Sequence, residues 1–216
     1  TLAMAVSPNS AAATVGGAIA NTLIGSSNNK QSVRAALNDA TVNMVAGANL
    51  SVQAVNDASL ANFALGGGAA ASGNVGISAQ GSAAAVDIHS DTLASMNNTN
   101  VNATNGKLEL SAQSDNDIVS SADAANVAFG STVGVAGGAA ISVVNSDADT
   151  KVEAKRDSGY STWNAKDVLL SANSQNDIIN VAMGLGVGAS GTAGVAVEGN
   201  VAVNNINNDT LVDVAG

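Results

Sequence analysis

The stretch VAVNNINNDT, residues 201–210, starts as an alternating apolar strand and ends in asparagines followed by Asp-Thr. Related stretches end at Asp91-Thr92 and Asp149-Thr150, and Gln31-Ser32 is a degenerate first copy. The four copies recur at a nearly constant interval of about 60 residues. A fixed period in a chain of 216 residues predicts a repeat architecture, in which each unit packs against the next.

Two further landmarks keep the same period. One is an apolar strand that starts at Leu50, Leu108 and Val168, and the other is a glycine-centred stretch that starts at Val75, Val133 and Ala193. Only the segment from the Thr landmark to the next strand varies in length. It is shorter in 92–108 than in 32–50 or 150–168, which indicates a loop on a rigid frame. We expect a partial repeat at 1–32, repeats at 33–92, 93–150 and 151–210, and the start of another at 211–216, in a fragment of a longer protein.

Apolar residues alternate with a period of two within each repeat. Leu108 and Leu110 fall on one face with Glu109 on the other, and no sustained helical stripe occurs. A unit of about 60 residues divides into three turns of about 20, the size of one coil of a parallel β-helix. The prediction is therefore an all-β chain that forms one parallel β-helix, or β-solenoid, over residues 1–216. It has about three coils per 58–60-residue repeat, with the asparagine-rich stretches at its corners.

Composition and charge restrict the classes of function that this chain can have. Aromatic residues make up 2% of the chain and apolar residues 46%, with 23 glycines, which suits thin, closely stacked backbone layers. A net charge of -10 argues against a nucleic-acid partner. The absence of cysteine excludes disulfides and thiolate sites. The uncharged runs 124–144 and 181–197 approach the length of a membrane helix, but their glycines and alternating valines predict strands and no membrane insertion.

The segment AKRDSGYSTWNAKD, residues 154–167, is the one place where aromatic and basic residues meet. Aromatic residues and arginine are the usual anchors of binding, so Lys155, Arg156, Tyr160 and Trp163 are candidates for contact with a sugar or a peptide. The alternative is that Trp163 packs over the end of a strand and shields the core.

No catalytic, cofactor or metal site is expected. The single histidine, His89, has polar counterparts in the other repeats, so a surface role is favoured over a hydrolase triad. Carboxylates are spread along the chain rather than clustered. The acidic stretches at 115–117 and 175–177 are interpreted as solvated turns rather than calcium ligands.

The motif L-x-L-x-A, followed by Asn-Asp, a Gly/Ala/Val-rich run and AVAVNNINNDT, resembles the repeats of large filamentous adhesins of Gram-negative bacteria. These are the haemagglutinin-like or leukotoxin-type proteins of type V secretion. The resemblance covers essentially the whole chain and is strongest at 194–211. It implies an extended stalk or passenger, secreted or displayed on the bacterial outer surface, that mediates attachment to a protein or glycan of a host or neighbouring cell.

Two other functions stay open at this point. Open strand edges favour end-to-end self-association, as in a self-assembling extracellular matrix fibre. Many β-helices are carbohydrate-active enzymes, which would need a carboxylate cluster beside aromatic platforms in one groove. The sequence names neither the receptor nor the export route.

Overall fold

The computed structural model describes residues 1–156 and 162–215, which form strands and connections and contain no helix. Two parallel sheets account for all the named strands. Sheet A contains β1 (Leu2–Ser7), β4 (Thr41–Asn43), β5 (Leu50–Ser72), β7 (Asn100–Gly130) and β9 (Trp163–Ser190). Sheet B contains β2 (Ala12–Ile24), β3 (Gln31–Asn38), β6 (Val75–Asn97), β8 (Val133–Lys155), β10 (Ala193–Ile206) and β11 (Thr210–Ala215). The all-β prediction is confirmed.

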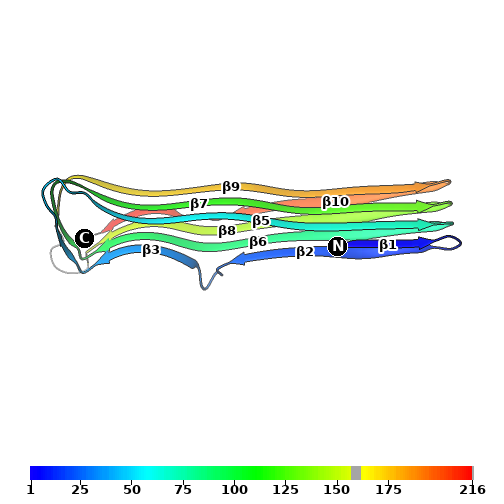
Figure 1. The fold of residues 1–216 in the computed structure, drawn as a ribbon, viewed down its shortest axis with the longest axis horizontal. Helices are drawn as coiled ribbons and strands as arrows, with labels where there is room; N and C mark the ends of the chain where they lie inside the picture. The colour runs from blue at the N-terminus through cyan, green and yellow to red at the C-terminus, as the bar shows by residue number, and fades with distance from the viewer. Residues whose placement is uncertain (157–161, 216) are drawn as a thin grey trace.

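The chain passes from one sheet to the other with every long strand (Figure 1). One passage through sheet A and the next through sheet B make a layer. Layer 1 contains β1, β2 and β3, layer 2 contains β4, β5 and β6, layer 3 contains β7 and β8, and layer 4 contains β9, β10 and β11. Each layer forms parallel backbone hydrogen bonds with the next, so equivalent residues of successive repeats lie side by side.

The expectation of three coils per repeat is wrong. Leu50 pairs with Leu108 and Leu108 pairs with Val168, so the lateral neighbours are one whole repeat apart rather than one third of a repeat. One repeat is therefore one layer, with strands of up to 31 residues. The reason is that alternating sequence without proline has nothing to end a strand after six or seven residues.

The asparagine-rich stretches also lie elsewhere than expected. In layers 2 and 3 they are inside β6 and β8, which run without a break through Asp91-Thr92 and Asp149-Thr150. In the two outer layers the stretch interrupts the sheet, between β2 and β3 in layer 1 and between β10 and β11 in layer 4. The actual turns at one end of the molecule are two-residue connections at 73–74, 131–132 and 191–192, and these stack on one another through backbone hydrogen bonds.

The predicted variable loop is confirmed at the other end of the strands. The pairing of β7 with β9 changes register there, because Ala103 pairs with Ala165 whereas Lys107 pairs with Asp167. Four steps along β7 therefore match only two steps along β9. The chain from Thr150 to Trp163 is four residues longer than the chain from Thr92 to Val101, and the shift returns two of these residues before the long strands begin. From Lys107 to Gly130 the register with β9 is constant.

Side chains between the sheets become smaller along the strands. Near the variable loops the core holds large residues such as Leu108, Leu110 and Met96, and in the middle it holds Ile118 and Val144. The next part consists of alanines: Ala64, Ala84, Ala122, Ala124 and Ala140. Toward the two-residue turns, inward Gly76, Ser78 and Asn126 accompany buried alanines such as Ala128 and Ala136.

Glycine is required where the facing sheets approach most closely. A Cβ atom on Gly66 would lie 2.7 Å from the carbonyl oxygen of Gly81 in the opposite sheet. A Cβ atom on Gly76 would overlap the carbonyl oxygen of Phe129. The thin, closely stacked layers predicted from composition are found in this half of the molecule.

A chain of polar side chains crosses all four layers inside this narrow part. Thr14 Oγ1 donates to Ser78 Oγ at 3.0 Å, and Ser78 Oγ donates to Asn126 Oδ1 at 3.4 Å. Asn126 Nδ2 then donates to Glu198 Oε1 at 3.3 Å. The other oxygen of Glu198, Oε2, is buried without a hydrogen-bond partner among the described residues. Buried polar groups that hydrogen-bond to one another favour one stacking order of the layers, whereas a buried group without a hydrogen-bond partner lowers the stability of the fold.

Candidate contact surface at the Trp163 end

The segment singled out in the sequence forms the wall of a small cavity at the variable-loop end of the molecule. The cavity has a volume of about 240 Å³. Its lining consists of Met96, Thr99, Ala154, Lys155, Arg156, Trp163, Val214 and Ala215. Three of the four predicted contact residues therefore meet at one place. The fourth, Tyr160, lies outside the described residues.

Trp163 is the first residue of β9 and is half-buried. Its indole Nε1 donates to the carbonyl oxygen of Thr99 at 3.1 Å, and its ring packs against the large-residue part of the core. This geometry matches the alternative interpretation, in which the ring shields the end of a strand. Trp163 also lines the cavity, so it contributes both to the core and to the cavity wall.

Lys155 is held by two carboxylates on the outer face of sheet B. Its Nζ lies 3.1 Å from Glu153 Oε1 and 3.4 Å from Asp213 Oδ2. Lys151 approaches the same two groups, at 2.9 Å from Glu153 and 3.5 Å from Asp213. The hydrogen bond from Lys151 lowers the pKa of Glu153, and the hydrogen bond to Glu153 raises the pKa of Lys155. Arg156, by contrast, is exposed at the rim of the cavity.

A second ionic cluster lies further along the same face, and the sequence did not predict it. Lys30 extends from the connection between β2 and β3 and places its Nζ 2.7 Å from Asp149, 3.2 Å from Asp147 and 3.6 Å from Asp91. Burial disfavours the charge of Lys30, but hydrogen bonds to Asp149 and Asp147 outweigh it and raise the pKa of Lys30. The sequence shows only that Asp91 and Asp149 occupy equivalent positions in two repeats. That they lie side by side, close enough to share one lysine, follows from the register of β6 with β8.

His89 belongs to this cluster. Its Nε2 lies 3.1 Å from Asp87, and its Nδ1 lies 3.3 Å from Asp147. Burial opposes ionisation of Asp147, but hydrogen bonds from His89 and Lys30 outweigh it and lower the pKa of Asp147. His89 thus lies on the outer face of a strand among carboxylates, rather than at the corner expected from the sequence.

The acidic stretches interpreted as turns lie inside strands. Asp115 and Asp117 are in the middle of β7, and Asp177 is in β9 beside Asp117. Between them, Asn116 points inward and donates its Nδ2 to Asn176 Oδ1 of the next layer at 2.9 Å. Within residues 1–156 and 162–215, no three His, Asp or Glu side chains are arranged to hold a metal ion.

At the Trp163 end, the exposed guanidinium of Arg156 lies beside an apolar cavity. The neighbouring charged groups of Lys151, Glu153, Lys155 and Asp213 are already paired with one another. A cavity of about 240 Å³ is smaller than the roughly 300–1,000 Å³ of most sites for drug-sized ligands. It has room for one side chain or one small group of a larger partner. The rest of the contact would be made on the surrounding surface.

No family model, curated protein or solved structure matches this chain significantly. The fold itself defines the chain as an all-β protein with parallel strands in two sheets. In the part of the chain that the structure describes, no helix is long and apolar enough to cross a membrane.

Proposed function

We propose that this chain is a β-solenoid segment of a secreted filamentous adhesin and acts as a structural and adhesive passenger on the bacterial outer surface, without catalysis. The observation that carries the proposal is the constant register between layers. Equivalent positions of β5, β7 and β9 pair directly, so repeats are interchangeable layers of one scaffold. Repeat scaffolds of this kind present extended surfaces for binding.

The dimensions favour a passenger over a long projecting stalk. Each layer uses one whole repeat and adds only about 4.8 Å along the stacking direction. A strand of 31 residues, in contrast, extends roughly 100 Å at about 3.3 Å per residue. Each additional repeat would therefore add a strip roughly 100 Å long to the two outer faces while lengthening the stack by only about 4.8 Å. This geometry supports a role in which the chain binds along its faces and ends.

The partner would be a protein or glycan of a host or neighbouring cell, and the contact would include the Trp163 end. Arg156 is the side chain most available for it, because it is exposed and its planar donor group suits carboxylates and sugar hydroxyls. Lys155 is already engaged by Glu153 and Asp213. Trp163 would supply the apolar edge of the contact.

The test is a binding assay of the purified chain on host epithelial cells and on a glycan array. Arg156→Ala is expected to reduce binding about tenfold, the cost of losing one charge-assisted contact. The matched control is Arg34→Ala, because Arg34 is the other arginine and its Nε donates to Ser32 Oγ at 2.7 Å on β3. Equal binding by wild type and Arg156→Ala would reject this contact site. Absence of binding by the wild-type chain would reject the adhesive role.

A further inference from the structure

One half of the outer face of sheet B is apolar across all four layers. We name it the apolar B face and define it by five outward positions on each of four strands. They are Ala13, Val15, Gly17, Ile19 and Asn21 on β2; Ile77, Ala79, Gly81, Ala83 and Ala85 on β6; Val135, Gly137, Ala139, Ile141 and Val143 on β8; and Val195, Val197, Gly199, Val201 and Val203 on β10. The register places each set of four side by side.

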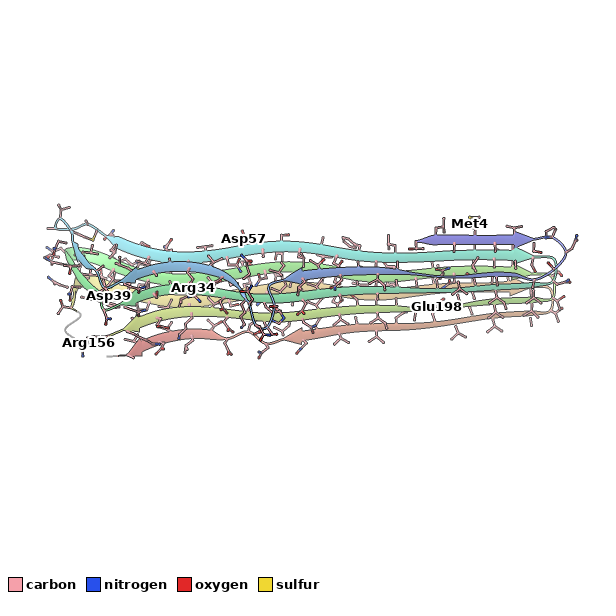
Figure 2. The ribbon with its side chains drawn as sticks, turned by 90° about the horizontal axis from the view of Figure 1, so that it is seen from below. Met4, Arg34, Asp39, Asp57, Arg156 and Glu198 are labelled. Carbon is pink, nitrogen blue, oxygen red and sulfur yellow. The ribbon has the colours of Figure 1, made fainter. Side chains whose placement is uncertain are left out.

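Large apolar side chains on this face are strongly exposed. Val15 is 80% exposed, Ile19 85% and Val197 64%. Among the twenty positions only Asn21 is polar, and none is charged. Figure 2 shows side chains projecting from both outer surfaces of the paired sheets along the long axis. The sequence of β10 alternates as a half-buried strand would, yet its valines point away from the opposite sheet.

The apolar B face is large enough to form an interface with a partner. Five outward positions cover roughly 33 Å along the strands, and four strands cover roughly 19 Å across them, which gives an area of roughly 600 Å². The largest apolar patch on a typical monomer is about 300–600 Å² and is often functional, and the apolar B face lies at the upper end of this range. Two such faces in contact would bury about 1,200 Å² in total, the lower end of the range for stable protein interfaces.

The glycines on this face have no explanation inside the described chain. Gly76 and Gly134 point inward, where backbone atoms of the opposite sheet block a Cβ atom. On the apolar B face, a Cβ on Gly17 or Gly81 would make only ordinary contacts, at 3.6 Å and 3.8 Å, and one on Gly199 would meet nothing within 4 Å. Glycine weakens a strand unless another backbone or side chain approaches closely. Gly17, Gly81 and Gly199 form one row with Ala139, so this row of small residues leaves a shallow groove across the strands.

A ridge lies directly beside that groove. Ile19, Ile141 and Val201 project from the neighbouring outward positions, two residues along each strand, and the smaller Ala83 occupies the same row on β6. A half-turn about an axis that lies in the plane of the interface, perpendicular to the strands and midway between ridge and groove, turns a second copy face to face with the first and brings its ridge over the groove. The face is therefore complementary to itself, as a two-fold interface requires.

Charge determines the orientation of the second copy. Outward charges on sheet B begin at Asp87 and continue through the Lys30 cluster to Glu153, all in the other half of the strands. In an antiparallel pair the apolar halves overlap and the charged halves point in opposite directions. Each chain has a net charge of -10. In this arrangement the length of the strands separates the charged halves of the two copies, which limits their mutual repulsion.

We propose that two copies of this chain pair face to face through the apolar B face, with their strands antiparallel and the Ile141 ridge of each copy in the Gly81 groove of the other. This interface is distinct from the open strand edges at which end-to-end association would occur. It does not depend on the proposed adhesive role, because it needs only the register and the exposure of β2, β6, β8 and β10.

The experiment is sedimentation equilibrium of the full chain at concentrations up to about 100 μM, well above the dissociation constant of a stable dimer. Ile141→Lys places a charge at the centre of the face and is expected to weaken dimerisation at least about 100-fold. The matched control is Val127→Lys, which puts the same charge on the same layer but on the outer face of sheet A. It is expected to leave the dimer unchanged.

A second variant tests the fit without adding charge. Gly81→Val fills the groove and has room for its Cβ within one chain, so its thermal unfolding midpoint should equal or exceed that of the wild type while dimerisation is lost. This variant decides the question if circular dichroism shows that Ile141→Lys does not fold. A monomeric wild-type chain, a dimer that survives both substitutions, or open-ended filaments unaffected by them would each overturn the proposal.

Discussion

Lys30 Nζ lies 2.7 Å from Asp149 Oδ2, although 119 residues and two layers separate them in the stack. The same ammonium group reaches Asp147 and Asp91, so one cation fastens the connection between β2 and β3 onto layers 2 and 3. Stacked repeats place like charges above one another, and Lys30 offsets the repulsion within this acidic column.

Replacement of Lys30 should therefore destabilise the fold. Lys30→Met is expected to lower the free energy of unfolding by about 1 kcal/mol, because three neighbouring carboxylates lose their common partner. Added salt should narrow the difference from wild type, since it screens the remaining repulsion. Urea unfolding at low and high ionic strength measures both effects. Arg34→Met is the control, and an equal loss in both variants would show that the ion pairs contribute nothing specific.

The paired carboxylates predict lower stability in acid. The pKa values of Glu153 and Asp147 are lowered in the fold from their ordinary values of 4.5 and 3.8. In that range the unfolded chain binds more protons, so the free energy of unfolding is highest above about pH 4.5 and falls as the pH drops through the folded values. Glu153→Gln should reduce this slope when unfolding is followed between about pH 2.5 and 6. An unchanged slope would show that Glu153 gains nothing from Lys151.

Inward and outward glycines should respond differently to alanine. Gly76→Ala pushes a methyl group onto the carbonyl oxygen of Phe129 and should cost about 2 kcal/mol through displaced backbone. Gly81→Ala enters open space and should change stability by less than about 0.5 kcal/mol or increase it. The two positions lie on the same strand, β6, so they form a matched pair for chemical denaturation. Equal losses would mean that the sheets do not approach as closely as described.

Glu198 is the weak member of the polar chain between the sheets. Its Oε2 has no partner among the described residues, and the position two layers away on the same inward column is Gln80. Glu198→Gln keeps the acceptor for Asn126 and removes a buried carboxylate, so the free energy of unfolding should rise by about 1 kcal/mol. Thermal unfolding at pH 7 tests this, with Glu109→Gln on an outward position as the control. A loss of stability in Glu198→Gln would show that the carboxylate has a favourable partner.

The sequence predicted the class of fold but not the number of windings. The repeat period equals the offset in sequence between paired residues of neighbouring layers. The inward placement of Leu108 and Leu110 follows from their alternation with polar residues. The prediction that the asparagine-rich stretches form corners was wrong for layers 2 and 3, where β6 and β8 continue through them. Asparagine tolerates a turn but does not require one. The turns at 73–74, 131–132 and 191–192 contain only two residues each, too short a signal to distinguish from the many other glycines and serines.

The candidate site was predicted in part for a similar reason. Lys155, Arg156 and Trp163 are close in sequence, so their proximity in the cavity required little tertiary information. The Lys30 cluster joins residues from three repeats, and no local pattern identifies it. The apolar B face could not be predicted either. Alternation shows that the valines of β10 share a face, but not which of the two faces is covered.

The repeated two-residue connections of layers 2, 3 and 4 have a consequence for how such a gene can change. Any in-frame duplication or deletion of one complete period would add or remove a whole layer, and the flanking layers would meet neighbours of the same kind as before. Unequal recombination between copies would thus yield proteins of different size that still fold. Selection could act on total surface area without redesigning a single contact.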